Sequence, residues 1–422
     1  MIVGLTLRNF KGIQSLDALP LSRFQVLVGP NGVGKTTVLD AIDFVRDCLA
    51  EGPGAAVESR GIADFNDLTW MRRGGTVEIE LWLDLSAELP ALSDSLVQYR
   101  LAVRQDSKLG VCIEDEALRQ YSRARLPKSG ELRFSPAVKP KRLLGKTSKG
   151  TDYYSRETSS YQDSFNFGLD KLTLALTPPD EDRYSTANAV RRFLMQGVRY
   201  IQLNSRAMRL PCPTTRGTDL DLDGTNMARV VGRLIGNNGQ EGPNPRAMLW
   251  LLSKANEPLW AEPDSAVARW VAHLRYALPD LVNIGWDRRQ ADNAEFLVLR
   301  YENGLDVPSW LLSDGTLRML ALTLPAFLPA ESALYMVEEP ENGVHPKALE
   351  IILRSLSAIP GGQILLATHS PLVVQQCGIN PLLCFSRDKE GTHIVPGPKH
   401  PVLKKWDGMP DLGVVFAAGL LE

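Results

Sequence analysis

The sequence predicts an α/β protein with a mainly parallel sheet flanked by helices and a large lobe inserted between two halves of that sheet. Two observations predict this fold class. Strand-like apolar stretches alternate with helical stretches near both ends of the chain, the pattern of a parallel sheet covered on both faces. One of these strands runs into a glycine-rich loop that opens a helix.

The composition is that of an ordinary globular protein: 422 residues, 44% hydrophobic and 23% charged, with a net charge of −2. A positively charged surface for nucleic acid would therefore have to be confined to one part of the chain. The N-terminal stretch MIVGLTLRNFKG lacks the pattern of a signal peptide, and no apolar run of ~18 residues could span a membrane. We therefore expect a cytoplasmic protein without membrane contact. The five cysteines are scattered without C-x-x-C spacing, which argues against zinc and disulfides.

Residues 1–96 are expected to form the N-terminal part of the main domain. A strand is predicted at residues 3–8 and a second at residues 24–28, just before the glycine-rich loop. Helical spacing of apolar residues follows over 37–45, and residues 76–83 alternate polar and apolar as a half-buried strand does.

Residues 97–300 are expected to form an inserted α+β lobe. Weaker signals there predict a hairpin, two helices and a returning strand, at residues 99–103 with 110–113, 225–235, 265–277 and 295–300. No sustained heptad pattern occurs, so we expect no long coiled coil.

A basic stretch lies within this lobe. Residues 119–149 hold ten basic side chains against one acidic residue, Glu131. Five aromatic residues follow: Tyr153, Tyr154, Tyr161, Phe165 and Phe167. Such a combination can grip a phosphate backbone and stack bases, so Arg119–Lys149 is a candidate DNA contact. A solvated loop kept soluble by its charge explains the stretch equally well.

Residues 301–422 are expected to complete the main domain. Helices are predicted at 315–327 and 346–356, each followed by a buried strand, at 333–337 and 363–367. The two ends of the chain would then share one sheet.

The glycine-rich loop reads GPNGVGKT and has the G-x-x-x-x-G-K-[ST] spacing between a strand and a helix. Backbone N–H groups and a helix N-terminus in such a loop hold phosphate oxygens, the lysine reaches the β- and γ-phosphates, and the hydroxyl helps to hold Mg²⁺. The candidate residues for this cradle are Gly29, Pro30, Asn31, Gly32, Val33, Gly34, Lys35, Thr36 and Thr37.

Two adjacent carboxylates, Glu338 and Glu339, end the apolar stretch LYMV. Like charges at the end of a buried strand repel each other and lose hydration, and a cation together with a water molecule to be activated would resolve this. Glu338 is therefore predicted to lie by Mg²⁺, and Glu339 to polarise the attacking water.

Two further motifs flank these acids. Ser313, Asp314 and Gly315 open a helix and offer a hydroxyl and backbone N–H groups to an anion, although such a turn is also a common helix start. His369 leaves the end of a buried strand, where its ring can donate to a γ-phosphate. His345 is a candidate contact of the site, but its position at the start of a helix explains it equally well.

In this order the motifs resemble the ATP-binding-cassette (ABC) ATPases. They are most similar to the SMC/RecF/OLD-like branch and, within it, to stand-alone ATPases of the AAA_21 type. The resemblance is carried by LTLRNFKGIQ, GPNGVGKTT, LDLDGTNMARVVGRL, LLSDGTLRMLAL, LYMVEEPENGVHP, LLATHSPLVV and DLGVVFAAGLL. It touches both ends and part of the middle, whereas residues 87–200 match loosely.

The resemblance implies an ABC-type head, with an antiparallel β lobe beside the parallel sheet, that binds ATP and Mg²⁺ and hydrolyses ATP. Lys35 would contact phosphate, and Thr36 would hold the metal together with Glu338. Glu339 would be the catalytic base and His369 the switch histidine. Arg8 and Lys11 would lie near the adenine or the phosphates.

The resemblance also implies a homodimer, because Ser313 and Gly315 would form the signature that closes on ATP bound to a second subunit. Two departures from the family pattern stand out. Glu338 replaces the usual metal-associated aspartate, and no glutamine occurs between residues 51 and 97, where the family often places one that senses the γ-phosphate. Asn66 or Asp67 is a candidate substitute.

Two functions follow from the resemblance. The first is a DNA-associated ATPase switch in genome maintenance or antiphage defence. The alternative is an ATP-state switch that scaffolds a separate effector, a nuclease or toxin, without essential DNA contact. A transporter cassette is disfavoured by the large insert and by the EEPEN sequence.

Overall fold

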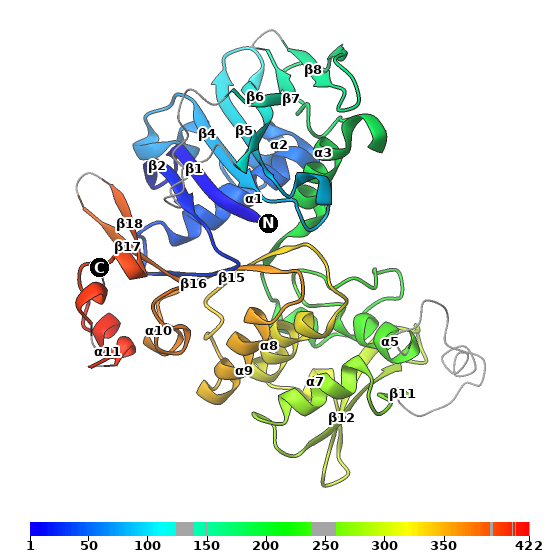
Figure 1. Cartoon of the computed structure of the whole chain (residues 1–422). Helices are drawn as coiled ribbons and strands as arrows, with labels where there is room; N and C mark the ends of the chain where they lie inside the picture. The colour runs from blue at the N-terminus through cyan, green and yellow to red at the C-terminus, as the bar shows by residue number, and fades with distance from the viewer. Residues whose placement is uncertain are drawn as a thin grey trace.

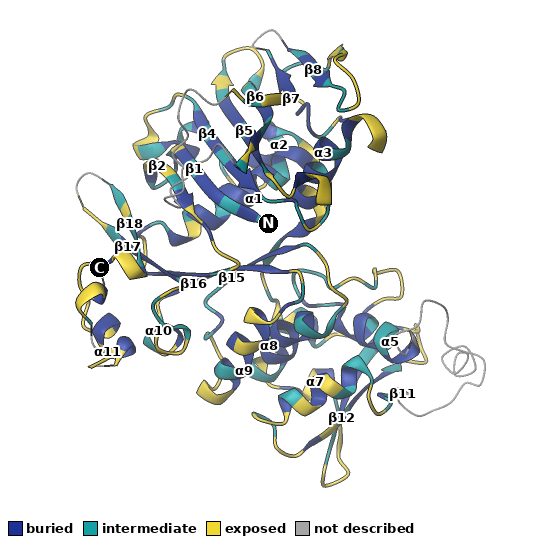
Figure 2. Ribbon diagram, in the orientation of Figure 1, coloured by how far each residue is buried: buried dark blue, intermediate teal, exposed yellow. Residues whose placement is uncertain are grey.

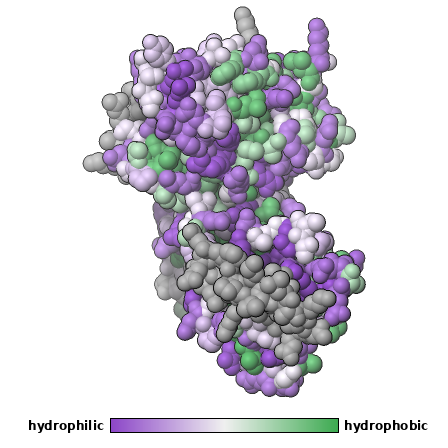
Figure 3. All heavy atoms as spheres, turned by 90° about the vertical axis from the view of Figure 1, so that its right-hand side faces the viewer, coloured by the Kyte–Doolittle hydropathy of each residue, from purple (hydrophilic) through white to green (hydrophobic). Residues whose placement is uncertain are grey.

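The computed structural model describes residues 1–123, 139–147, 150–237, 259–388, 391–406, 408–409 and 411–421. Two lobes lie on either side of a central parallel sheet (Figure 1). Figure 3 shows the same two lobes from the side, joined by a narrower waist. No helix in these ranges is long and apolar enough to cross a membrane.

The central sheet has six strands in the order β10–β15–β16–β3–β17–β18. All neighbours are parallel except β18, which is antiparallel to β17. The strands are β3 (Phe24–Val28), β10 (Val198–Ile201), β15 (Leu334–Glu338), β16 (Gln363–Thr368), β17 (Leu382–Arg387) and β18 (Thr392–Pro396). The expectation that the two ends of the chain share one sheet is therefore confirmed.

The sheet is buried on both faces because its apolar strands alternate between two hydrophobic cores. In β16, Leu365 and Ala367 enter the core on one face, whereas Ile364 and Leu366 enter the core on the other. A period of two residues is what a strand covered on both sides requires. Figure 2 shows the same burial as dark blue strands between the lobes.

The first lobe is an antiparallel sheet of eight strands in the order β2–β1–β4–β5–β6–β7–β8–β9. Its strands are β1 (Ile2–Phe10), β2 (Ile13–Pro20), β4 (Val77–Leu83), β5 (Ser95–Asp106), β6 (Gly110–Ser122), β7 (Lys141–Lys146), β8 (Thr151–Ser155) and β9 (Gln162–Asn166). Helix α1 (Lys35–Glu51) shares one core with this sheet and with one face of the parallel sheet. Helices α2 (Pro53–Glu58) and α3 (Glu181–Arg192) belong to the same lobe.

The second lobe covers the other face of the parallel sheet. Its sheet is β11 (Leu259–Trp260), β12 (Leu281–Arg288), β13 (Glu295–Tyr301) and β14 (Asp306–Pro308). Its helices are α4 (Ser205–Met208), α5 (Met227–Asn237), α7 (Ala266–Leu274), α8 (Asp314–Thr323) and α9 (Pro346–Ser357). Two short helices, α10 (Pro371–Cys377) and α11 (Leu412–Ala417), lie near the C-terminus (Figure 1).

The resulting fold is the expected α/β head with an antiparallel β lobe. The longest described helix, α1, has 17 residues, so this part of the chain holds no long coiled coil. The boundary expected at residues 96 and 97 falls inside β5, and β10 carries a segment of 97–300 into the parallel sheet. The three-part domain division stays a prediction, but the sheets do not follow it.

The described basic residues of 119–149 differ in burial. Lys139, Lys141 and Arg142 are exposed, and residues 124–138 and 148–149 lie outside the described ranges. Lys146 is fully buried, where its Nζ lies 2.6 Å from Oδ1 of Asp152 and donates to the carbonyl of Gly168 at 2.7 Å. Lys146, one of the ten basic residues of the candidate DNA contact Arg119–Lys149, therefore faces the core and not the solvent.

One aromatic residue after the basic stretch is also unavailable to a ligand. Tyr154 is buried in the core of the first lobe, and its hydroxyl donates to the carbonyl of Thr173 at 2.7 Å. The charge pattern could not reveal this, because β7 and β8 direct alternate residues into the core.

Candidate active site at the carboxyl ends of the central strands

The phosphate loop begins where β3 ends, and its glycines are conformationally required. Gly29, Gly32 and Gly34 have φ angles of 148°, 80° and 106°, which side chains rarely allow. A Cβ atom on Gly29 would also lie 2.5 Å from the carbonyl oxygen of Phe385 in β17. The loop can therefore run closely along the neighbouring strand only with glycine at this position.

Lys35 is the first residue of α1 and is buried. Its Nζ donates to the carbonyls of Gly29 at 2.6 Å and Pro30 at 2.7 Å, so the ammonium group lies inside the curl of the loop. The N-terminus of α1 has no side-chain cap and no acidic residue in its first turn. Uncapped N–H groups around a lysine form an anion site, which fits phosphate. Thr36, the next residue, is exposed at this helix start.

Glu338 ends β15, two strands away from β3. Its Oε1 is buried and has no hydrogen-bond partner in the described chain. A buried carboxylate oxygen without a partner is costly, and a cation would remove that cost. The described residues contain no cluster of three or more His, Cys, Asp or Glu suited to a metal. This arrangement fits Mg²⁺, which in nucleotide sites binds one or two carboxylates together with phosphate oxygens.

Glu339 and His369 meet at the ends of two neighbouring strands. Nδ1 of His369 lies 3.0 Å from Oε1 of Glu339, and the second carboxylate oxygen accepts a hydrogen bond from Asn342. Glu339 has a positive φ of 46°, which is strained for glutamate, and its N–H donates to the carbonyl of Ala367 at 2.8 Å. This backbone conformation breaks the alternation of side chains along β15 and directs the Glu339 side chain towards His369.

Lys11 and the loop that follows α2 lie together beside α1. The Nζ of Lys11 is 2.6 Å from Oδ2 of Asp40, and its N–H donates to the carbonyl of Leu68 at 2.8 Å. Asn66 and Asp67 belong to the 3₁₀ helix that ends at Leu68, and Asp67 is paired with Arg72 at 2.8 Å.

Arg8 lies on an exposed part of β1. Its guanidinium group binds Ser15 and Asp17, both on the neighbouring strand β2. Arg8 is therefore engaged within its own hairpin, whereas Lys11 is tied to α1.

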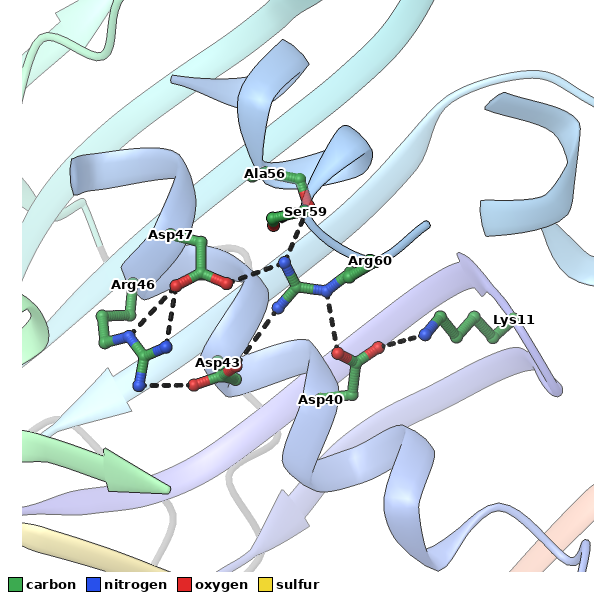
Figure 4. Close-up of polar contacts among 8 residues, drawn as sticks. All are labelled: Lys11, Asp40, Asp43, Arg46, Asp47, Ala56, Ser59 and Arg60. Atoms are coloured by element: carbon green, nitrogen blue, oxygen red, sulfur yellow. Dashed lines mark hydrogen bonds and ion pairs between the residues drawn. The ribbon is translucent and has the colours of Figure 1, made fainter. Parts of the chain in front are cut away.

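An arginine that the sequence reasoning did not single out organises this side of α1 (Figure 4). Arg60 reaches Asp40 at 2.9 Å, Asp47 at 2.8 Å and Asp43 at 3.4 Å, and it also donates to the carbonyl of Ala56 at 2.7 Å. Arg46 completes the cluster by pairing with Asp43 and Asp47. Burial raises the pKa of Asp43 to about 6 despite these arginines.

Gln202 is a second residue that the sequence reasoning missed. It follows β10 directly, and the last register pair of β10 with β15 is Ile201 with Val337. Continuing that register by one residue sets Gln202 beside Glu338. A strand of four residues has too short a pattern for recognition from sequence, and Gln202 lies outside residues 51–97, where the family pattern places its glutamine.

The turn that opens α8 is held by hydrogen bonds, an ion pair and close packing against a neighbouring loop. Oγ of Ser313 accepts a hydrogen bond from the N–H of Thr316 at 3.1 Å, as an N-cap does. The guanidinium group of Arg209 pairs with Asp314 at 2.6 Å and donates to the carbonyl of Leu312. A Cβ atom on Gly315 would lie 2.6 Å from the carbonyl oxygen of Gly343, so this turn packs against the loop after the two carboxylates.

The structure therefore brings some predicted site residues together and leaves others apart. Lys35, Glu338, Glu339 and His369 come from the carboxyl ends of β3, β15 and β16, which are consecutive strands. Ser313 lines an open hollow of about 570 Å³ in the second lobe, and in the described chain it makes no hydrogen bond to those four residues.

Comparison with known proteins places the chain among ATPase-type domains. The family model AAA_21, described as "AAA domain, putative AbiEii toxin, Type IV TA system", matches residues 24–149 and 246–375, which is more than half of the chain.

Two curated relatives match short stretches. Protein ea59 of Escherichia phage lambda is 30% identical over 112 residues, which are 25% of this chain and 21% of that protein. The OLD nuclease of Thermus scotoductus is 49% identical over 45 residues, which are 11% of this chain and 8% of that protein. The chain thus spans only a small part of either relative.

Solved structures resemble the chain over most of its length. A structure described as the SmcHead bound to the C-winged helix domain of ScpA has a TM-score of 0.51 at 13% identity, and the match covers 93% of this chain and 97% of that one. At this level of identity the likeness establishes the fold, that of an SMC head.

Proposed function

Because the chain belongs to the AAA_21 family of ATPase-type domains, we propose that it binds and hydrolyses ATP with Mg²⁺ and that two copies close around two ATP molecules. The observation that supports this most strongly is the meeting of Glu339 and His369 at the carboxyl ends of β15 and β16, the second of which pairs with the phosphate-loop strand β3. In open α/β sheets, ligands bind beyond the carboxyl ends of the strands.

The proposed chemistry assigns one task to each side chain. The loop N–H groups and Lys35 bind the phosphates, for which the ammonium group would exchange its two carbonyl partners for phosphate oxygens. Glu339 accepts a proton from the attacking water, and His369 holds the carboxylate in place and donates to the γ-phosphate. Arg8 and Lys11 remain proposed contacts of the nucleotide.

Thr36 and Glu338 are the proposed protein ligands of Mg²⁺. The ion would neutralise charge on the β- and γ-phosphate oxygens. Gln202 is proposed to sense the γ-phosphate in place of the glutamine that is missing between residues 51 and 97, because it lies at the same strand ends as Glu338. Asn66 and Asp67 are less suited, since the Asn66 amide donates to Asp64 and the Asp67 carboxylate pairs with Arg72.

Ser313 and Gly315 are proposed to act across a dimer. The hydrogen bonds described for the Ser313 hydroxyl go to Thr316 and not to the phosphate loop, and its turn opens a helix whose N–H groups can bind an anion. A second copy would supply this turn to each ATP, so contacts to the γ-phosphate would favour the closed dimer.

A DNA-associated role in genome maintenance or antiphage defence is the proposed biological setting. It is supported by Lys139, Lys141 and Arg142, which are exposed near β7, together with the half-buried Arg119. Such side chains can neutralise backbone phosphates.

The alternative role, scaffolding a separate effector protein, is supported by a different surface. Helices α10 and α11 pack together, with Gln375 donating to Asp411 at 2.9 Å. They nevertheless expose Leu372 and Val414, which are 44% and 55% accessible. Exposed apolar side chains on adjoining helices can form a protein contact.

Static light scattering tests the proposal as a whole. Purified Glu339→Gln protein is expected to shift from monomer to dimer when ATP and Mg²⁺ are added, and to remain dimeric because hydrolysis is blocked. ATP turnover by the unmodified protein, measured at low salt with and without duplex DNA, tests the DNA role. If the Glu339→Gln protein stays monomeric with and without ATP and Mg²⁺, the proposal that two subunits share the ATP sites is refuted. If the unmodified protein shows no ATP turnover, the proposed ATPase activity is refuted.

A further inference from the structure

Glu338 has a neighbour on the edge strand that no part of the proposed chemistry uses. Tyr200 lies on β10, in register with Met336 of β15, and burial together with the nearby Glu338 carboxylate raises the pKa of its hydroxyl. Tyr200 packs against the core shared with α1, to which Met336 also belongs. Since alternate residues of a strand share a face, Glu338 emerges on the same face as Tyr200.

This face is strongly acidic. A hollow of about 510 Å³ beside Tyr200 is lined by Asp40, Asp43, Asp47, Glu51 and Asp223, with Arg46 and Arg60 as the basic residues among its lining. Beside ionised carboxylates, which can only accept hydrogen bonds, a phenol hydroxyl acts as the donor.

A glutamate at this position needs such a restraint more than an aspartate would. The longer side chain has one more rotatable bond, and the nearby aspartates repel its charge. The hydroxyl of Tyr200 supplies a donor, yet Oε1 of Glu338 is still buried without a partner in the described chain. One restrained carboxylate with one unsatisfied oxygen is an arrangement ready for a cation.

We propose that Tyr200 is a positioning residue that restrains Glu338, so that its unsatisfied oxygen is available to the Mg²⁺ of bound ATP. This inference rests on the proposed function and adds a residue to it. Tyr200 touches neither phosphate nor water in this scheme, and it acts only through Glu338.

The test is equilibrium binding of a non-hydrolysable fluorescent ATP analogue, measured with Mg²⁺ and with EDTA. The ratio of the two affinities reports how much Mg²⁺ strengthens binding. In Tyr200→Phe this ratio is expected to fall about tenfold, the lower range for loss of an outer-shell partner of a metal ligand. Affinity in EDTA should be unchanged, which a general loss of structure would not allow.

Tyr335→Phe is the matched control. Tyr335 lies on β15, faces the opposite core, and accepts a hydrogen bond from Arg199 at 2.9 Å through the same kind of hydroxyl. Its removal should leave the ratio unchanged. In a Glu338→Gln background, where the metal-binding carboxylate is already lost, Tyr200→Phe should have no further effect on the ratio.

The outcomes separate the inference from its premise. If the unmodified protein binds the analogue more tightly with Mg²⁺ and Tyr200→Phe keeps the full ratio, Tyr200 is not a positioning residue, although the ATP site stands. An equal loss in Tyr335→Phe would also overturn the inference. If the unmodified protein binds no analogue in either buffer, the proposed function fails, and the role of Tyr200 fails with it.

Discussion

Nδ1 of His369 lies 3.0 Å from Oε1 of Glu339, and the two residues come from the ends of β16 and β15. They stand 30 positions apart in the sequence, and parallel pairing of the two strands brings them together. The contact directs Nδ1 of the ring to the carboxylate, and Nε2 is the nitrogen that we propose donates to the γ-phosphate. This relationship is the centre of the proposed active site.

The Glu339→Gln variant should lose turnover while retaining ATP binding. An amide cannot accept the proton of the attacking water, so the hydrolysis rate should fall by about 10²- to 10⁴-fold. The variant keeps the shape of the side chain and its contact with Asn342. Phosphate release measures the rate and analogue binding measures affinity. A rate within a few-fold of the original would show that Glu339 is not the base.

Arg60→Ala should destabilise the protein strongly, because removing it leaves three aspartates beside one another on a partly buried helix face. Loss of one partner from a buried ion cluster costs about 3–5 kcal/mol. Arg72→Ala is the control, since Arg72 also pairs with two aspartates but its side chain is 66% exposed. Its loss should cost at most about 1 kcal/mol. Urea denaturation compares the two variants, and equal losses would contradict the structural role of Arg60.

Asp43 should make stability fall as pH rises through its folded pKa. Burial raises that pKa from 3.8 to about 6, so the folded state holds the proton more tightly than the unfolded state between these values. The stabilisation is complete below about pH 4 and lost above about pH 6, and it amounts to at most about 3 kcal/mol. Asp43→Asn should remove this component of the slope in urea denaturation between pH 4 and 7. Identical slopes in both proteins would contradict the assignment.

Arg142 and Lys146 should separate DNA contact from stability. Arg142→Glu reverses an exposed charge and should weaken DNA binding and lower its salt dependence without changing the unfolding midpoint. Lys146→Met should instead lower the midpoint, because it leaves Asp152 buried without its ion-pair partner. Fluorescence anisotropy with labelled duplex and thermal unfolding measure the two effects. Unchanged DNA binding in Arg142→Glu would argue for the effector role.

Much of the fold could be predicted because its central elements carry strong local patterns. The apolar strands around Val26, Met336 and Leu365 alternate with helices, and each was expected within a few residues of its observed position. The edge strand β10 was not expected, because four residues give too little periodicity. The hairpin of β5 and β6 was expected, but its pairing with β4 and the strands β7 to β9 were not, since strand pairing depends on contacts that local patterns do not encode.

The candidate site also contains residues that could be predicted from the sequence and residues that could not. Gly29, Lys35 and the two glutamates belong to contiguous motifs, so their chemistry could be inferred from spacing. Tyr200, Gln202 and Arg60 have no motif of their own, and their importance emerges only when β10 and the turn after α2 are set against β15 and α1.

Complementation between two inactive variants tests the shared site most directly. Lys35→Ala should abolish phosphate binding, and Ser313→Arg should leave binding intact but prevent closure, so each alone should be inactive. When the two are mixed and allowed to exchange subunits, mixed dimers contain one site with an intact Lys35 and an intact Ser313, and turnover should return to about a quarter of the original for random pairing. A mixture no more active than the mean of its components would contradict the account.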